Sequence, residues 1–287
     1  MQQKSIHWFP GHMKKALKEI EERLKIMDVI IEIVDARAPI SSRNPYLKDL
    51  APQKKRLIVL AKKDLADEEE TKRWVEYFKN EEIIALPLDL TYPKSDAELK
   101  KAIQSLGKDK WEKDQRRGLK PQPLKTMIIG IPNVGKSTLI NRLSRRNAAS
   151  VQNTPGHTRA QQWIKVDQLF ELLDTPGILP MQYEDPTYSM HLAWLGSIKE
   201  DILPLTVIAT ELLSFLKDYH SAKLEIRYQI EGLKDMSLEE IWLQIAKKRG
   251  LLTKGEPDVE KAERLLLKEF KDGTLGRITI EKRESAC

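Results

Sequence analysis

The run Met127–Thr138, MIIGIPNVGKST, is the segment that most constrains the fold of this chain. It contains the pattern G-x-x-x-x-G-K-S, preceded by an apolar β-branched stretch and followed by apolar residues at helical spacing. In a strand, loop and helix context, this pattern directs backbone N–H groups at the start of a helix towards one anion. It therefore predicts a loop that binds the phosphates of a nucleotide.

Each part of this loop has an expected role. Lys136 should reach the β- and γ-phosphates, and the Ser137 hydroxyl should ligate Mg²⁺. Gly135 is required because a Cβ at this position would obstruct the phosphate. The residues expected to bind the nucleotide here are Asn133, Val134, Gly135, Lys136, Ser137 and Thr138.

Strand-like and helix-like segments alternate through the first two thirds of the chain, which favours βαβ units on a mostly parallel sheet. The expected strands are 29–34, 56–60, 83–86 and 126–131, and the expected helices are 14–27, 68–80, 96–106 and 135–145. Residues 163–166 and 169–173 predict a hairpin at one edge of the sheet.

After about residue 200 the strand signals stop, and helix-like segments follow at 205–219, 238–248 and 259–271. We therefore expect two domains. Residues 1–198 should form an α/β nucleotide-binding domain with an N-terminal helical element, and residues 199–287 a small all-helical domain that is a candidate RNA contact.

Two further motifs follow the phosphate-binding loop. Asp174 and Gly177 belong to the sequence DTPG, where the carboxylate can hold a Mg²⁺-bound water and the glycine N–H can reach the γ-phosphate. Thr158 lies between the two motifs, and its hydroxyl suits the Mg²⁺ shell in a loop that orders with the γ-phosphate. The expected metal ligands are Ser137, Thr158 and Asp174. This order of motifs predicts a nucleoside-triphosphate switch.

Base recognition should come from an N-K-x-D element at a strand end, because an Asp carboxylate accepts from guanine N1–H and N2–H₂, where adenine has no donor. The one candidate is AKKD at 61–64, so Lys62 and Asp64 are expected to bind the nucleotide. This element precedes the phosphate-binding loop. That order is typical of a circularly permuted GTPase, a rearrangement tolerated because domain termini usually lie close together at the surface.

With these motifs the sequence resembles the bacterial ribosome biogenesis GTPase A family and its mitochondrial relatives. The resemblance covers nearly the whole chain and includes HWFPGHM at 7–13, VDAR at 34–37, SRNP at 42–45, QQWIKV at 161–166 and GSIK at 196–199. It implies a cytoplasmic GTPase that binds GTP, GDP and Mg²⁺. It also implies a role in late maturation of the large ribosomal subunit, contact with its ribosomal RNA, and stimulation by the particle.

Two segments depart from the pattern of the resembled family. Ala61 stands where the family has Asn, which removes an amide that braces the nucleotide loops and contacts the base. The loss of one such buried contact costs about 1–3 kcal/mol, so weaker guanine binding is expected. The segment Leu88-Asp89-Leu90 matches poorly the Ser/Ala-containing loop that is expected to cap the base.

Hydrolysis should be slow without a partner. Ile178 follows DTPG, where many GTPases carry a water-orienting Gln, and an aliphatic side chain cannot orient the attacking water. In the resembled family this catalytic role belongs to the His of WFPGHM, which corresponds to His12; packing or an RNA contact is its alternative role. Asn133 matches the Asn with which potassium-stimulated GTPases hold K⁺ near the phosphates. Dependence of the activity on K⁺ is therefore a further hypothesis.

Composition sets further limits. No apolar run approaches the roughly 20 residues that span a bilayer, so no membrane is expected. The only cysteine is Cys287, and no disulfide can form within the chain, which fits the cytoplasm. The net charge is +6, and residues 100–125 hold nine basic and three acidic side chains. This segment suits contact with RNA phosphates, although a solvated helix face explains it equally well. A monomer is expected.

Two alternatives stay open at this point. The chain could be a nucleotide-gated RNA-binding assembly factor with negligible hydrolysis, in which Ala61 and Ile178 mark the decay of catalysis. It could also be a permuted P-loop ATPase. The first alternative is disfavoured by the retained residues Lys136, Ser137, Thr158 and Asp174, and the second is disfavoured by Asp64.

Overall fold

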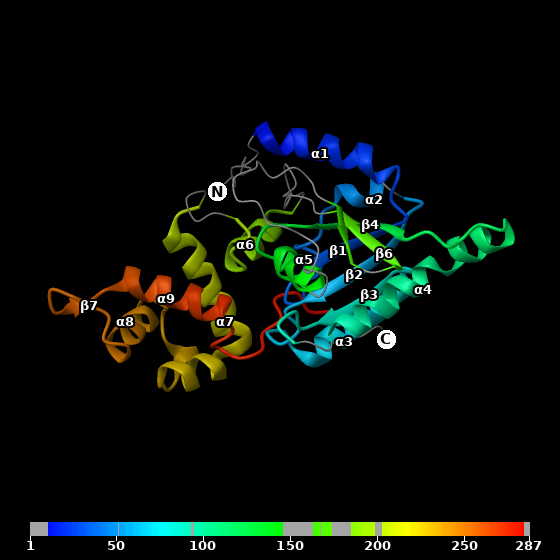
Figure 1. Cartoon of the computed structure of the whole chain (residues 1–287). Coiled ribbons are helices and arrows are strands. Elements are labelled where there is room, and N and C mark those ends of the chain that lie inside the picture. The colour runs from blue at the N-terminus through cyan, green and yellow to red at the C-terminus, as the bar shows by residue number, and fades with distance from the viewer. Residues whose placement is uncertain are drawn as a thin grey trace. The chain divides into compact units, whose positions relative to one another are not determined.

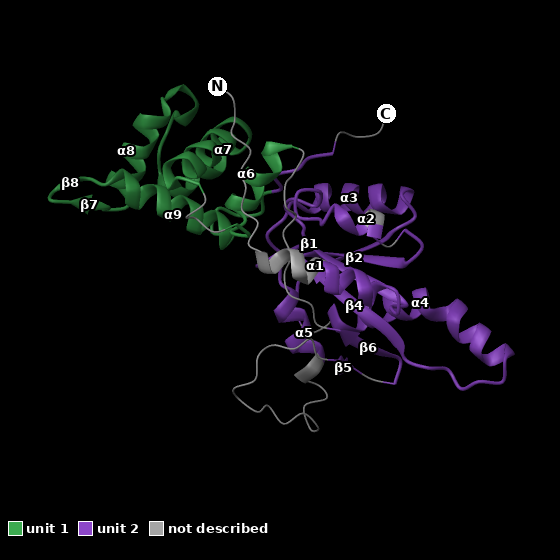
Figure 2. Ribbon diagram, turned by 90° about the horizontal axis from the view of Figure 1, so that it is seen from above, with its two compact units in different colours: residues 1–6, 183–278 green, residues 7–182, 279–287 purple. Residues whose placement is uncertain are grey.

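The computed structural model describes residues 11–50, 52–92, 95–145, 163–166, 168–173, 185–198 and 203–283, with backbone only at 11–17, 48, 49, 144 and 145. These residues form two compact units, coloured separately in Figure 2. The sheet unit contains the described residues up to Leu173 together with 279–283, and the helical unit contains 185–278.

The sheet unit is built on a six-stranded sheet (Figure 1). Its strands are β1 (Val29–Asp35), β2 (Lys55–Ala61), β3 (Ile84–Leu88), β4 (Leu124–Gly130), β5 (Trp163–Lys165) and β6 (Phe170–Leu173). They lie in the order β3-β2-β1-β4-β6-β5, and every neighbouring pair is parallel except the antiparallel pair β5–β6. The mostly parallel sheet and the hairpin at its edge are confirmed.

The helices of this unit are α1 (Gly11–Leu24), α2 (Tyr46–Leu50), α3 (Glu68–Asn80), α4 (Ser95–Arg116) and α5 (Lys136–Arg145). Helix α3 begins where the Asp67 carboxylate accepts from the N–H groups of Glu69 and Glu70. Helix α4 continues past its predicted end at 106, because its last two turns bury no apolar side chain and the helical hydrophobic pattern stops before the helix does.

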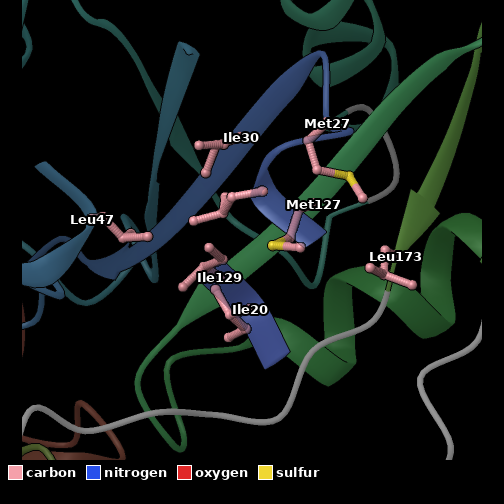
Figure 3. Packing of buried hydrophobic residues seen from close by; sticks show 8 residues of the cluster. Ile20, Met27, Ile30, Leu47, Met127, Ile129 and Leu173 are labelled. Carbon is pink, nitrogen blue, oxygen red and sulfur yellow. The ribbon is translucent and has the colours of Figure 1, made fainter. Parts of the chain in front are cut away.

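Both faces of the sheet are covered, since every residue of β1 is buried. Figure 3 shows the cluster that α1 and α2 form with three strands. Its members are Ile20, Leu24, Met27, Ile30, Leu47, Met127, Ile129 and Leu173. Trp74 and Phe78 of α3 pack on Val34, Ile58 and Leu60 in a second cluster. Helix α4 contacts β1, β2 and β3, and α5 contacts β4.

The helical unit contains α6 (Pro186–Trp194), α7 (Leu205–Tyr228), the 3₁₀ turn η1 (Leu233–Asp235), α8 (Leu238–Lys248) and α9 (Val259–Lys271). A short hairpin of β7 (Leu252–Thr253) and β8 (Glu256–Pro257) joins α8 to α9. Helix α7 is kinked at His220, whose φ is −142°. No helix within the described ranges is long and apolar enough to cross a membrane.

The boundary between the two units does not fall at the predicted position, 198/199, but before α6. Helix α6 belongs to the helical unit, because Trp194 donates its Nε1–H to Ile208 O at 3.0 Å and lies 5.5 Å from the ring of Phe215. Residues 279–283 return to the sheet unit. Both differences come from long-range packing, which sequence periodicity does not report.

Candidate functional site

The candidate site lies at the carboxyl edge of the parallel strands. Strand order runs from β1 to β2 and β3 on one side, and from β4 to β6 on the other, so the chain changes direction between β1 and β4. Ligands of open α/β sheets bind outside the carboxyl ends of the strands at such a point. The loop after Gly130 of β4 begins there.

Glycine shapes the start of this loop. A Cβ on Gly130 would lie 2.8 Å from Ile33 O of the neighbouring strand and 2.9 Å from Val134 Cγ1. No side chain fits at that spacing. Gly130 therefore lets β4 pair with β1 while the chain turns back towards α5.

The loop itself has the backbone of an anion cradle. Asn133 and Gly135 both have positive φ, at 61° and 107°, and Lys136 is the first residue of α5. Left-handed residues before a helix turn successive N–H groups towards a common point, where the helix dipole also favours negative charge. Val134 is buried, whereas Ser137 and Thr138 are exposed in the first helical turn. The loop has the geometry expected of a phosphate site.

The predicted base-recognition element lies beside this cradle. Ala61 ends β2, and its Cβ would lie 3.9 Å from a Cβ on Gly135. The structure thus brings together Ala61 and Gly135, which are 74 residues apart in the chain. Asp64 is exposed in the turn that follows β2, where Leu65 N donates to Lys62 O at 2.9 Å.

Lys62 is positioned by a carboxylate that sequence reasoning did not assign to the site. Its Nζ lies 3.0 Å from Asp35 Oδ2 at the end of β1, and its φ is 58°. Arg37 donates to the same carboxylate through Nε at 3.0 Å and Nη2 at 2.9 Å. In the sequence, the signal that could have assigned Asp35 to the site is its position as an acidic residue at the end of an apolar strand.

The charge of Asp35 is maintained despite full burial. Burial by itself raises the pKa of this carboxyl, but the charges of Arg37 and Lys62 and the hydrogen bonds from Arg37 outweigh it. The pKa of Asp35 is held well below its ordinary value. The carboxylate therefore holds the Lys62 ammonium in place. A backbone hydrogen bond also joins the ends of the two strands, because Ala36 N, directly after β1, donates to Ala61 O of β2 at 2.8 Å.

Several predicted site residues lie outside the described residues. These are the side chain of His12 and the residues Thr158, Asp174 and Gly177. The described site therefore contains the loop predicted to bind the phosphates and the element predicted to recognise the base, with Asn133, Val134, Gly135, Lys136, Ser137 and Thr138 on the first and Lys62 and Asp64 on the second. Its backbone geometry fits a bound nucleotide.

Comparison with known proteins gives a consistent result. A family model described as 50S ribosome-binding GTPase matches residues 125–246. Ribosome biogenesis GTPase A of Bacillus cereus is 42% identical over 280 residues, which cover 97% of this chain and 94% of that protein. Mitochondrial ribosome-associated GTPase 1 of Mus musculus is 32% identical, with 96% of this chain and 90% of that protein covered.

Solved structures show the same architecture. GNP-bound YlqF from T. maritima is similar with a TM-score of 0.63 at 26% identity, covering 93% of this chain and 98% of that one. A GDP-bound TM YlqF has a TM-score of 0.68 at 26% identity, covering 93% of this chain and 100% of that one.

Proposed function

This chain belongs to the ribosome biogenesis GTPase A family and is a GTP-binding GTPase, and we propose that it acts in late maturation of the large ribosomal subunit. It binds the ribosomal RNA of the subunit precursor, and the particle stimulates its hydrolysis of GTP. The observation that carries its nucleotide-binding part is the proximity of Ala61 and Gly135, because it places the predicted base-recognition element beside the predicted phosphate loop in permuted order. The ribosomal part is supported by the similarity to ribosome biogenesis GTPase A proteins.

The nucleotide contacts follow from the loop geometry. Lys136 begins α5 and binds the β- and γ-phosphates, while backbone N–H groups of the loop bind the same oxygens. Ser137, with Thr158 and Asp174, holds Mg²⁺, which neutralises phosphate charge when bound. Gly177 contributes its N–H to the γ-phosphate, and Asp64 accepts from guanine.

Hydrolysis depends on a water-orienting group. Ile178 cannot serve, so His12 takes this role and intrinsic turnover is slow. Asn133, with its positive φ beside the phosphates, is the residue that would hold K⁺. The protein works as a monomer in the cytoplasm.

The charge of helix α4 supports contact with RNA. Its exposed cations, with those of the following loop, are Lys101, Lys108, Lys113, Arg116, Arg117 and Lys120. Only some are neutralised locally, for example Arg116, which lies 3.7 Å from Glu112. Exposed Lys and Arg side chains bind phosphates with an affinity that falls as salt rises. Residues 108–120 therefore form the RNA-facing part of the sheet unit in this proposal.

The test is hydrolysis of GTP and ATP with and without purified large-subunit particles. We expect slow GTP turnover that particles accelerate, and no comparable turnover of ATP. Lys136→Ala should abolish productive triphosphate binding, because the contact with the β- and γ-phosphates is lost.

Three results would contradict the proposal. Equal turnover of GTP and ATP would indicate a permuted ATPase. Nucleotide-dependent particle binding without any hydrolysis would indicate the binding factor considered above. Wild-type activity in Lys136→Ala would show that the assigned loop does not bind the phosphates.

A further inference from the structure

The two departures from the family pattern, Ala61 and Leu90, meet at one glycine of the phosphate loop. A Cβ on Gly135 would lie 2.9 Å from Leu90 Cδ1 and 3.9 Å from Ala61 Cβ. Ala61 is fully buried, and Leu90 is 7% exposed. The face of Gly135 that a side chain would occupy is therefore covered by apolar carbon from Ala61 at the end of β2 and from Leu90 in the segment after β3.

The loop that carries Leu90 is fixed to the helix of the phosphate loop. Arg142 of α5 donates through Nη1 to Leu90 O at 2.5 Å and through Nη2 to Tyr92 O. Its Nε also lies 2.5 Å from Asp96 Oδ1 at the start of α4. These contacts join α5 and the first turn of α4 to the segment after β3.

The segment is also stabilised internally. The Asp89 carboxylate accepts from Thr91 N at 2.8 Å and from Thr91 Oγ1 at 2.6 Å, and Ser95 Oγ donates to Asp89 O at 2.7 Å. This bonding holds the backbone of Leu90 in one conformation. Leu90 is thus presented to Gly135 by a defined loop.

We propose that Leu90, with Ala61, is an apolar brace for the phosphate loop and takes the place of the missing Asn amide. An Asn at position 61 would support the loop by hydrogen bonds, whereas Leu90 supports it by packing on Gly135. Leu90 is then a positioning residue for nucleotide binding. The inference rests on the proposed assignment of the 130–138 loop to the phosphates.

The brace predicts that positions 61 and 90 are coupled. The substitution Ala61→Asn, made while Leu90 is present, should bring no gain, because Leu90 already covers the glycine face that the amide would approach. Removing Leu90 should weaken nucleotide binding, and in that background Asn at position 61 should recover it. Residues in direct contact with one shared partner are those expected to be non-additive.

The experiment titrates fluorescent GDP against wild type, Leu90→Ala, Ala61→Asn and the double variant. We expect Leu90→Ala to raise Kd about tenfold, which corresponds to about 1.4 kcal/mol. Ala61→Asn alone should not lower Kd, and the double variant should bind GDP more tightly than Leu90→Ala. Leu90→Met, which keeps the side-chain volume, should bind as wild type does.

The control is Leu124→Ala. Leu124 is a buried residue that packs on Gly107 at the amino end of β4, whereas the candidate site lies at the carboxyl ends of the strands. It should lose stability without losing GDP affinity. If Leu90→Ala cannot be purified folded, Leu90→Val carries the same test with a smaller change.

The outcomes separate the two proposals. An unchanged Kd in the Leu90 variant, equal weakening in Leu124→Ala, or additive effects at positions 61 and 90 would overturn the brace. Failure of the wild type to bind GDP, or wild-type binding by Lys136→Ala, would instead overturn the assignment of the phosphate loop.

Discussion

Asp35 shows how a single residue can connect the core to the site. It is 1% exposed, and its carboxylate faces the guanidinium of Arg37, which is equally buried, and the ammonium of Lys62. Breaking a buried ion pair leaves an uncompensated charge in the interior. Asp35 is thus important both for stability and for the position of the base-side element.

Asp35→Asn should destabilise the sheet unit by about 3–5 kcal/mol, because Arg37 loses its buried counter-charge. Urea unfolding followed by tryptophan fluorescence measures this change. Asp109→Asn is the control, since its pair with Lys55 is largely exposed and should contribute little. Equal destabilisation by the two variants would contradict the role given to Asp35.

The pH dependence of stability has a definite sign at this residue. The pKa of Asp35 is lower in the folded protein than in the unfolded chain, so its stabilisation is complete above the ordinary Asp pKa of about 3.9. The stabilisation is lost as pH falls below that value and the unfolded chain takes up the proton. Wild type should therefore lose stability between about pH 4 and about pH 2 more steeply than Asp35→Asn.

At the level of elements, the last described segment of the chain, residues 279–283, is hydrogen-bonded to the sheet unit, and we call it the C-terminal strap. The Glu281 carboxylate accepts from Ile40 N at 2.6 Å and Ser41 N at 2.8 Å. Ile280 N donates to Arg37 O at 2.7 Å, and Trp74 Nε1 donates to Glu281 O at 2.9 Å. The strap thus holds the loop that follows Asp35.

Glu281→Ala should leave the N–H groups of Ile40 and Ser41 without their carboxylate acceptor. Both hydrogen bonds are partly buried, so the expected cost lies at the lower end of the range of about 1–3 kcal/mol for unsatisfied groups. Hydrogen exchange at these two amides should accelerate, and urea unfolding should shift. Glu76→Ala, on the exposed face of α3, should change neither; unchanged exchange in Glu281→Ala would argue against the strap.

At the scale of the whole molecule, the chain consists of two compact units that are each stabilised from within. In the helical unit, Glu269 accepts from Tyr228 Oη and Arg227 Nε, both at 2.9 Å. Burial raises the pKa of the Tyr228 hydroxyl, and the Glu269 charge adds to this, so the tyrosine stays protonated and remains a donor.

Particle-stimulated turnover is the property to measure on the whole chain. His12→Ala should remove most of the acceleration by large-subunit particles and leave GTP affinity nearly intact, since a contact made only in the transition state lowers turnover rather than ground-state binding. His7→Ala, in the same segment, is the matched control. Full stimulation of His12→Ala, with normal particle binding, would show that another group orients the water.

Local sequence patterns determined much of this protein. The phosphate loop and its flanking strand and helix follow from residues close together in the chain, and the permuted order of the motifs follows from their positions in the sequence. Helices 68–80, 238–248 and 259–271 were predicted with the observed bounds, because their apolar spacing lies within a few turns.

Only the tertiary structure decided how distant segments support the site. Leu90 against Gly135, Lys62 on Asp35, and Glu281 on the loop after β1 each join residues whose neighbours in sequence carry no sign of the partner. The same holds for α6, which packs with α7 and α9. The periodicity of apolar residues predicts that a side chain is buried. Which side chains it packs on depends on contacts between segments that are far apart in sequence.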